Sequence, residues 1–112
     1  MEKSPIQSLM IVIVQEQDMD LASRALTVLG VLVFHLSSSG GFLGRRNATL
    51  LVGMPDGKED EVRLALQKSC RQRVEYLAIP LEGSPMPLPT PVPVTVGGAT
   101  VFTIPVERFE EF

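Results

Sequence analysis

The sequence predicts a single α+β domain whose core has the element order βαββαβ. Two patterns indicate this class: short runs of branched apolar residues, and helical spacing of apolar residues between those runs. The length agrees with it, because the chain has 112 residues, 45% of them hydrophobic, which is enough apolar surface for one core. We therefore expect one domain over residues 9–112, preceded by a flexible leader at residues 1–8.

The first half of the predicted core runs strand, helix, strand. Residues 9–15 are rich in Ile and Val and end in polar residues, which is typical of a strand buried on both faces. Apolar residues then recur at helical spacing as far as Gly30, which suits a helix C-terminus, and Asp18 or Asp20 is expected to cap the start. Residues 31–36 are again branched and apolar, so they predict a second strand.

The second half runs strand, helix, strand again. Residues 47–53 hold a run of Ala, Thr, Leu and Val that returns as a third strand across a loop short enough for a hairpin. Asp56 with Glu59 three residues later resembles a capping box, and the apolar stripe that follows predicts a second helix through Arg71. Residues 74–79 predict a fourth strand, and this order is typical of a ferredoxin-like sheet with both helices on one face.

A proline-rich segment follows this core. Residues 80–93 contain prolines at nearly every second position toward their end, which excludes helix and central-strand structure, so we expect a long extended loop. Two roles are open for it: an arm that covers a sheet edge or packs on a neighbouring subunit, and a second wall of a pocket. Residues 92–96 and 99–104 flank Gly97 and Gly98, and this two-residue turn predicts an additional C-terminal β-hairpin.

Composition excludes several classes of function. Lys and Arg number 10 against 13 Asp and Glu, giving a net charge of -3, so the chain lacks the basic excess that attracts polymeric nucleic acid. We expect a soluble, cytoplasmic protein without a membrane partner, because the lone Cys70 has no disulfide partner in the chain and the apolar runs fall far short of the ~20 residues of a membrane span. A single His35 and a single Cys70 leave no metal cluster or Cys-His pair, so we expect no enzyme, no catalytic residue, no metal and no cofactor.

The segment 40–47 carries residue types that bind nucleotides. Its paired glycines let a ligand approach backbone amides, and Phe42 and Leu43 offer an apolar face to a base. Two arginines follow, which can meet phosphate, and the amide of Asn47 can pair with an adenine edge. The alternative is a solvated hairpin tip with a few exposed apolar residues.

A family resemblance is carried by three stretches, residues 13–18, 40–47 and 96–109. They resemble the cyclic di-AMP receptor family of PII-like signalling proteins, and the likeness runs from about Leu9 to Phe112 with the C-terminal stretch as its most specific part. The resemblance implies a ferredoxin-like homotrimer with ligand pockets between adjacent subunits. It also implies cyclic di-AMP as the candidate effector and regulation of an unknown downstream protein through a change in loop conformation.

By position, the resemblance implies six ligand-binding residues, which are Gly41, Phe42, Leu43, Asn47, Gly53 and Phe102. Three positions depart from the family pattern: Leu32 and Phe34 replace an arginine and a threonine, and Glu111 replaces a glutamine. Losing one contact to a charged group costs about 1.5 to 3 kcal/mol, so these departures bear on ligand choice. The alternatives are therefore a PII-like protein that senses another nucleotide or metabolite, and a protein-interaction module without a small ligand.

Overall fold

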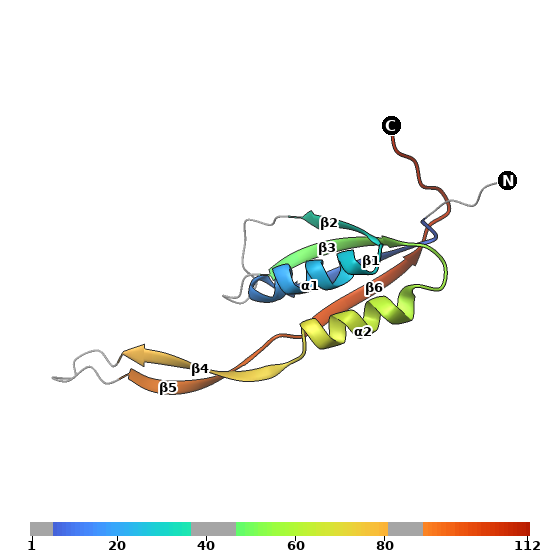
Figure 1. Cartoon of the computed structure of the whole chain (residues 1–112). Coiled ribbons are helices and arrows are strands. Elements are labelled where there is room, and N and C mark those ends of the chain that lie inside the picture. The colour runs from blue at the N-terminus through green and yellow to red at the C-terminus, as the bar shows by residue number, and fades with distance from the viewer. Residues whose placement is uncertain (1–5, 37–46, 81–88) are drawn as a thin grey trace.

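The computed structural model describes residues 6–36, 47–80 and 89–112. Along the chain the elements are β1 (Ser8–Gln15), α1 (Glu16–Val28), β2 (Leu32–Leu36), β3 (Asn47–Met54), α2 (Glu59–Ser69), β4 (Arg73–Pro80), β5 (Pro89–Val96) and β6 (Ala99–Pro105). Figure 1 shows β1, β2, β3 and β6 together in one layer, while β4 and β5 project from it as a ribbon. The predicted α+β class with a ferredoxin-like core is confirmed.

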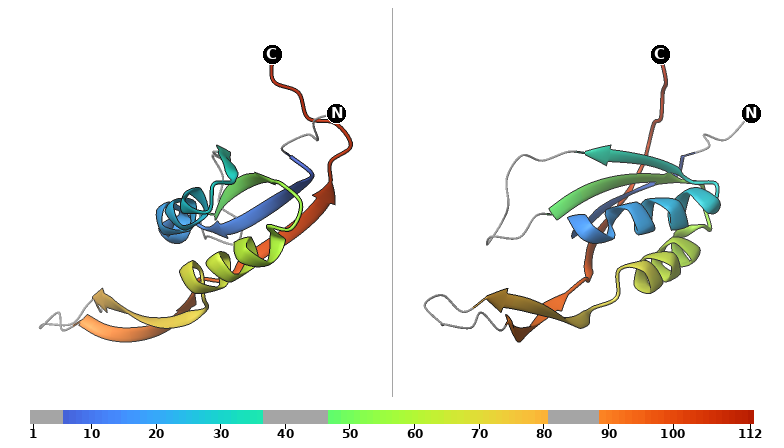
Figure 2. Two further views of the ribbon diagram at one scale, coloured as in Figure 1. Left: turned by 45° about the vertical axis from the view of Figure 1, so that its right-hand side comes forward. Right: turned by 60° about the vertical axis from the view of Figure 1, so that its left-hand side comes forward.

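The main sheet has the strand order β2-β3-β1-β6. Every neighbouring pair in it is antiparallel, and the register of β1 against β3 runs from Ser8 opposite Met54 to Gln15 opposite Asn47. Both helices lie on the same side of this sheet, as the two views in Figure 2 show. Because strand side chains alternate between faces, each strand has one face toward the helices and one face away from them.

The hydrophobic core lies between the helices and the sheet. β1 alternates buried and half-buried residues along its whole length, so its even-numbered residues face the helices. The buried members from the two central strands are Met10, Val12, Val14, Ala48, Leu50, Val52 and Met54, and α1 adds Ala22 and Leu26 while α2 adds Val62 and Leu66. Cys70 is 2% exposed and packs in the same cluster. Burial raises the pKa of the Cys70 thiol, as is typical of a small core residue.

The helix starts differ from the sequence prediction. Neither α1 nor α2 begins with a side chain that makes a capping hydrogen bond, so the predicted caps at Asp18 or Asp20 and at Asp56 are wrong. Asp18 lies instead inside the first turn of α1, where a carboxylate interacts favourably with the helix dipole. At the other end of the helix Gly30 has φ 78°, which confirms the predicted left-handed residue after the helix.

The strand that completes the core is not the predicted one. β4 pairs only with β5 among the described strands, from Arg73 opposite Val96 to Pro80 opposite Pro89. β6 takes the place beside β1 that was predicted for residues 74–79, and the predicted hairpin between residues 92–96 and 99–104 is wrong. Gly97 and Gly98 instead join the ribbon to the main sheet. The prolines of β5 are compatible with a strand because β5 is an edge strand.

Polar contacts fix the base of the ribbon against the core. The Arg73 guanidinium donates to both carboxylate oxygens of Asp18, with Nη2 2.8 Å from Oδ1 and Nη1 3.3 Å from Oδ2. Asp18 is only 3% exposed, so this pair is held in a largely dry environment, where removing one partner is costly. Beside it, the Gly97 N–H donates to Oε1 of Gln15 at 2.8 Å. These two contacts tie β4 and the end of β5 to α1 and β1.

Gly97 gives the first testable prediction. It has φ 87°, and a Cβ atom at this position would overlap the carbonyl oxygen of Arg71. Gly30 is a matched control, because it also has a positive φ but a Cβ there would meet nothing within 4 Å. Each Gly→Ala change costs about 1 to 2 kcal/mol for the left-handed backbone, and only Gly97→Ala adds the steric overlap. We expect Gly97→Ala to lower the urea midpoint of unfolding clearly more than Gly30→Ala. Equal midpoints would contradict this description of the junction.

Candidate functional site

The candidate site lies on the face of the main sheet that points away from the helices. We call this the open face. It carries the residues that the register places on the side opposite the core: Leu32, Phe34 and Leu36 from β2; Asn47, Thr49, Leu51 and Gly53 from β3; Leu9, Ile11 and Ile13 from β1; Thr100, Phe102 and Ile104 from β6. Within the described ranges, no helix or strand packs over this face.

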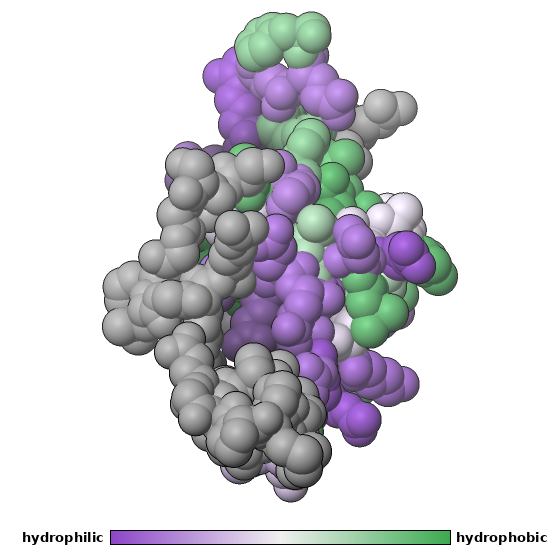
Figure 3. All heavy atoms as spheres, turned by 90° about the vertical axis from the view of Figure 1, so that its left-hand side faces the viewer, coloured by the Kyte–Doolittle hydropathy of each residue, from purple (hydrophilic) through white to green (hydrophobic). Residues whose placement is uncertain are grey.

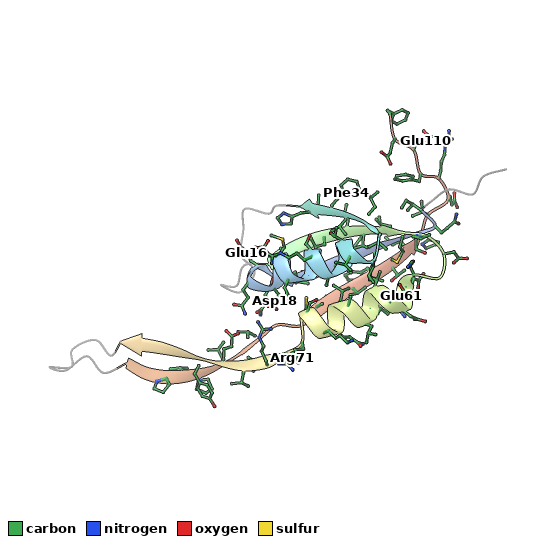
Figure 4. The ribbon with its side chains drawn as sticks, viewed as in Figure 1. Glu16, Asp18, Phe34, Glu61, Arg71 and Glu110 are labelled. Carbon is green, nitrogen blue, oxygen red and sulfur yellow. The ribbon has the colours of Figure 1, made fainter. Side chains whose placement is uncertain are left out.

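Apolar side chains on the open face remain in contact with solvent. Phe34 is 52% exposed, Phe102 55% and Ile104 44%. Figure 4 shows Phe34 pointing away from the helices. A contiguous exposed patch of this kind marks an interaction surface.

Gly53 sits between Leu32 on β2 and Leu9 on β1. A Cβ atom at Gly53 would come within 3.1 Å of the Ile6 side chain, so Ile6 from the N-terminal end of the described chain lies against the open face at this point. Ile6 is 8% exposed. Nothing in the sequence pattern pointed to Ile6, because its contact with Gly53 depends on the path of the chain before β1.

The predicted site residues fall into separate groups. Gly53 belongs to the β2 and β3 side of the open face, and Phe102 lies on β6 at the opposite edge. Asn47 begins β3, at the end of the sheet distant from Gly53. Gly41, Phe42 and Leu43 lie outside the described residues. The two strands between β6 and β2 separate Phe102 from the β2 edge by about 14 Å, at ~4.8 Å per strand.

The three departures from the family pattern are also placed by the register. Leu32 lies opposite Gly53, and Phe34 lies opposite Leu51, so both belong to the open face together with the predicted site. Glu111 is exposed in the C-terminal segment that follows β6. This segment leaves the sheet at the end that holds Leu32 and Gly53, because Pro105 is aligned with Ser8 and Met54.

Two cavities lined by described residues lie away from the open face. One of about 340 Å³ lies between α2 and the start of β6 and includes Cys70 and Gly98 in its lining. Another, of about 530 Å³, lies at the base of the ribbon and is lined by Lys68 and Arg71 among others. Figure 4 shows Arg71 at this position, where the chain passes from α2 into β4. Neither of these two linings includes a predicted ligand-binding residue.

Among the residues in the three described ranges, no group of three or more His, Cys, Asp or Glu side chains is arranged to hold a metal ion. Neither α1 nor α2 is long and apolar enough to cross a membrane. Figure 3 shows hydrophobic residues reaching the surface beside hydrophilic ones at the end of the molecule from which the ribbon projects. The open face offers apolar contact, the polar side chains of Asn47, Thr49 and Thr100, and one backbone position, Gly53, that lacks a side chain.

Comparison with known proteins gives one family and two solved structures. The model of a family described as "Cyclic-di-AMP receptor" matches residues 7–112. A functionally unknown protein from Pediococcus pentosaceus ATCC 25745 is 33% identical, with 97% of this chain and 100% of that chain covered and a TM-score of 0.75. A DUF3240 family protein from Shewanella baltica OS155 covers 98% of this chain and 99% of its own at 13% identity, with a TM-score of 0.55, and it supports the fold alone.

The open face gives the second testable prediction. Phe102→Asp places a charge on this face, whereas Leu21→Asp places one on α1, where Leu21 is 57% exposed. Both residues are about half exposed in the single chain, so neither change should unfold it. We expect Phe102→Asp alone to reduce self-association in sedimentation velocity, because a buried unpaired charge in an interface is costly. If both variants sediment like the unmodified chain, the open face is not an interface between copies.

Proposed function

Because the chain belongs to the cyclic-di-AMP receptor family, whose model spans residues 7–112, we propose that it binds a small nucleotide effector between adjacent subunits of a homotrimer. Cyclic di-AMP is the first candidate ligand. The matched family is a receptor family and not a class of enzymes. The observation that carries the proposal is the family match together with the register that puts Gly53 and Phe102 on one apolar, open face.

The separation of the site residues supports an inter-subunit pocket. Gly53 lies near the β2 edge and Phe102 on the β6 edge of the same face. When copies pack through this face, the β2 side of one copy can meet the β6 side of the next, which brings the two groups together. Burying Phe34, Phe102 and Ile104 in such a contact is favourable at roughly 25 cal/mol per Å² of apolar area.

The proposed output is conformational. A receptor does no chemistry on its ligand, and the ligand shifts the protein only by its different affinity for two arrangements. We propose that the bound nucleotide selects one arrangement of the segment 40–47, which contains the predicted contacts Gly41, Phe42, Leu43 and Asn47. A downstream protein would then distinguish the two arrangements.

A second candidate function is favoured by Leu32 and Phe34. Both lie on the open face, and Leu32 is directly opposite Gly53. The arginine of the family pattern is therefore absent from the predicted site itself. Cyclic di-AMP carries two phosphate charges, and an apolar residue gives no charge-assisted hydrogen bond to them. The alternative is a PII-like receptor for another nucleotide or a different small metabolite.

Isothermal titration calorimetry distinguishes these two candidate functions. Cyclic di-AMP, AMP and ATP are titrated separately into the full chain at one protein concentration. Submicromolar binding of cyclic di-AMP is the expected result, and selective binding of AMP or ATP would assign the alternative ligand. Absence of heat for all three, repeated by ligand-induced thermal shift, would contradict a nucleotide receptor and favour a protein-interaction module.

A charge substitution at Leu32 tests whether this position contributes to phosphate binding. Leu32→Arg restores a cation opposite Gly53, and Leu32→Met is the control because it keeps a similar volume without charge. One charge-assisted contact is worth about 1.5 to 3 kcal/mol, or roughly tenfold to a hundredfold in affinity. We expect Leu32→Arg to tighten cyclic di-AMP binding by at least tenfold in the titration. Equal affinities of the two variants would remove Leu32 from the site.

A further inference from the structure

The two edges of the β4–β5 ribbon differ in the hydrogen bonds that they can make. β5 holds Pro89, Pro91 and Pro93 at alternate positions, and proline has no N–H to donate. In an antiparallel pair, opposite residues alternately exchange two hydrogen bonds or none. The prolines therefore take the positions that do not bond to β4, and their carbonyl groups point to the outer edge of β5.

Because β4 is paired residue by residue with β5, its peptide groups follow the same alternation. Tyr76 lies opposite Pro93, and Ala78 lies opposite Pro91, so the peptide groups of Tyr76 and Ala78 also point outward. Val74 follows the same alternation. The outer edge of β4 thus presents N–H donors and carbonyl acceptors in regular order, which is the pattern that another strand needs. The outer edge of β5 presents mostly carbonyls and does not accept a regular strand.

Two β4 residues with outward peptide groups, Val74 and Tyr76, have uncharged and accessible side chains, while their neighbours Arg73 and Glu75 form an ion pair with each other at 3.2 Å. Val74 is 55% exposed and Tyr76 is 70% exposed. The ribbon projects from the main sheet in all three views of Figures 1 and 2, so the core of its own chain does not cover it. Proline is one of the residues by which proteins protect an edge strand from pairing. Here proline recurs along β5, whereas β4 has it only at its last residue, Pro80.

We infer that the outer edge of β4 docks against an edge strand of the main sheet, β2 or β6, in a second copy of the chain. This rests on the self-association proposed above, which brings the open edges of neighbouring copies close together at high effective concentration. The prolines of β5 then restrict docking to one side of the ribbon. They prevent open-ended assembly, in which β4 of one ribbon would pair with β5 of the next.

The symmetry of the assembly favours a main-sheet edge over a second β4. Pairing of β4 with β4 of another copy is a two-fold contact, which closes after two copies and does not build a ring of three. A contact between β4 and a different strand is heterologous, and heterologous contacts close into rings. β2 and β6 are the two outer strands of the main sheet.

Proline substitution on β4 directly tests whether its outer edge docks on a second copy. Tyr76→Pro removes one outward N–H and leaves the β4–β5 hydrogen bonds intact, and Tyr76→Ala is the matched control that loses the ring but keeps the N–H. We expect Tyr76→Pro to weaken assembly roughly tenfold relative to Tyr76→Ala in sedimentation velocity, as one lost hydrogen bond allows. Amide hydrogen exchange should be slow at Val74, Tyr76 and Ala78 in the assembled wild type, and slow on β2 or on β6.

The outcomes separate this inference from the proposed function. If the wild type stays monomeric at all concentrations, the proposed assembly itself fails. If the wild type assembles, but Tyr76→Pro assembles like Tyr76→Ala and the three amides exchange at the rate of exposed peptide groups, only the docking of β4 is contradicted. As a gain-of-function check, the double substitution Pro91→Val and Pro93→Val restores donors on β5 and should produce species larger than the wild-type assembly.

Discussion

The alternation of side chains along β1 and β3 determines which residues are buried in the core and which lie on the open face. These central strands bury one set of residues beneath the helices, and the same two-residue period places the other set on the open face. A shift of one residue would exchange the two sets, so the buried core and the candidate site are specified by one register. Leu32, Phe34, Gly53 and Phe102 share a face for this reason, although they come from three different strands.

The ribbon depends on a second constraint, which is local to its base. The Asp18–Arg73 ion pair and the contact of Gly97 with Gln15 hold β4 and the end of β5 against α1 and β1. These contacts leave the remainder of the ribbon outside the core with one protected edge and one open edge. Within the described part of the chain, the apolar open face and the edge of β4 are therefore both left uncovered, as the proposed assembly of copies requires.

The sequence predicted the elements well where the signal is local. Runs of apolar residues located β1 and β3, and Gly97 and Gly98 have the positive φ typical of a turn, at 87° and 88°. The predicted hairpin around these glycines failed because φ alone does not choose the strand partner. That choice comes from Arg73, which is 55 residues from Asp18, and such a pairing leaves no local pattern. The faces of Leu32 and Phe34 and the contact of Ile6 with Gly53 likewise required the register and the chain path.

We propose that the ligand site exists only where two copies meet. The most direct test is the binding of fluorescently labelled cyclic di-AMP across a protein dilution series, with the oligomeric state measured at each concentration by sedimentation. Binding should be lost in parallel with dissociation, because Gly53 on β3 and Phe102 on the edge strand β6 are expected to form one site only between copies. An affinity that stays constant as the protein becomes monomeric would contradict the claim and place the site within a single chain.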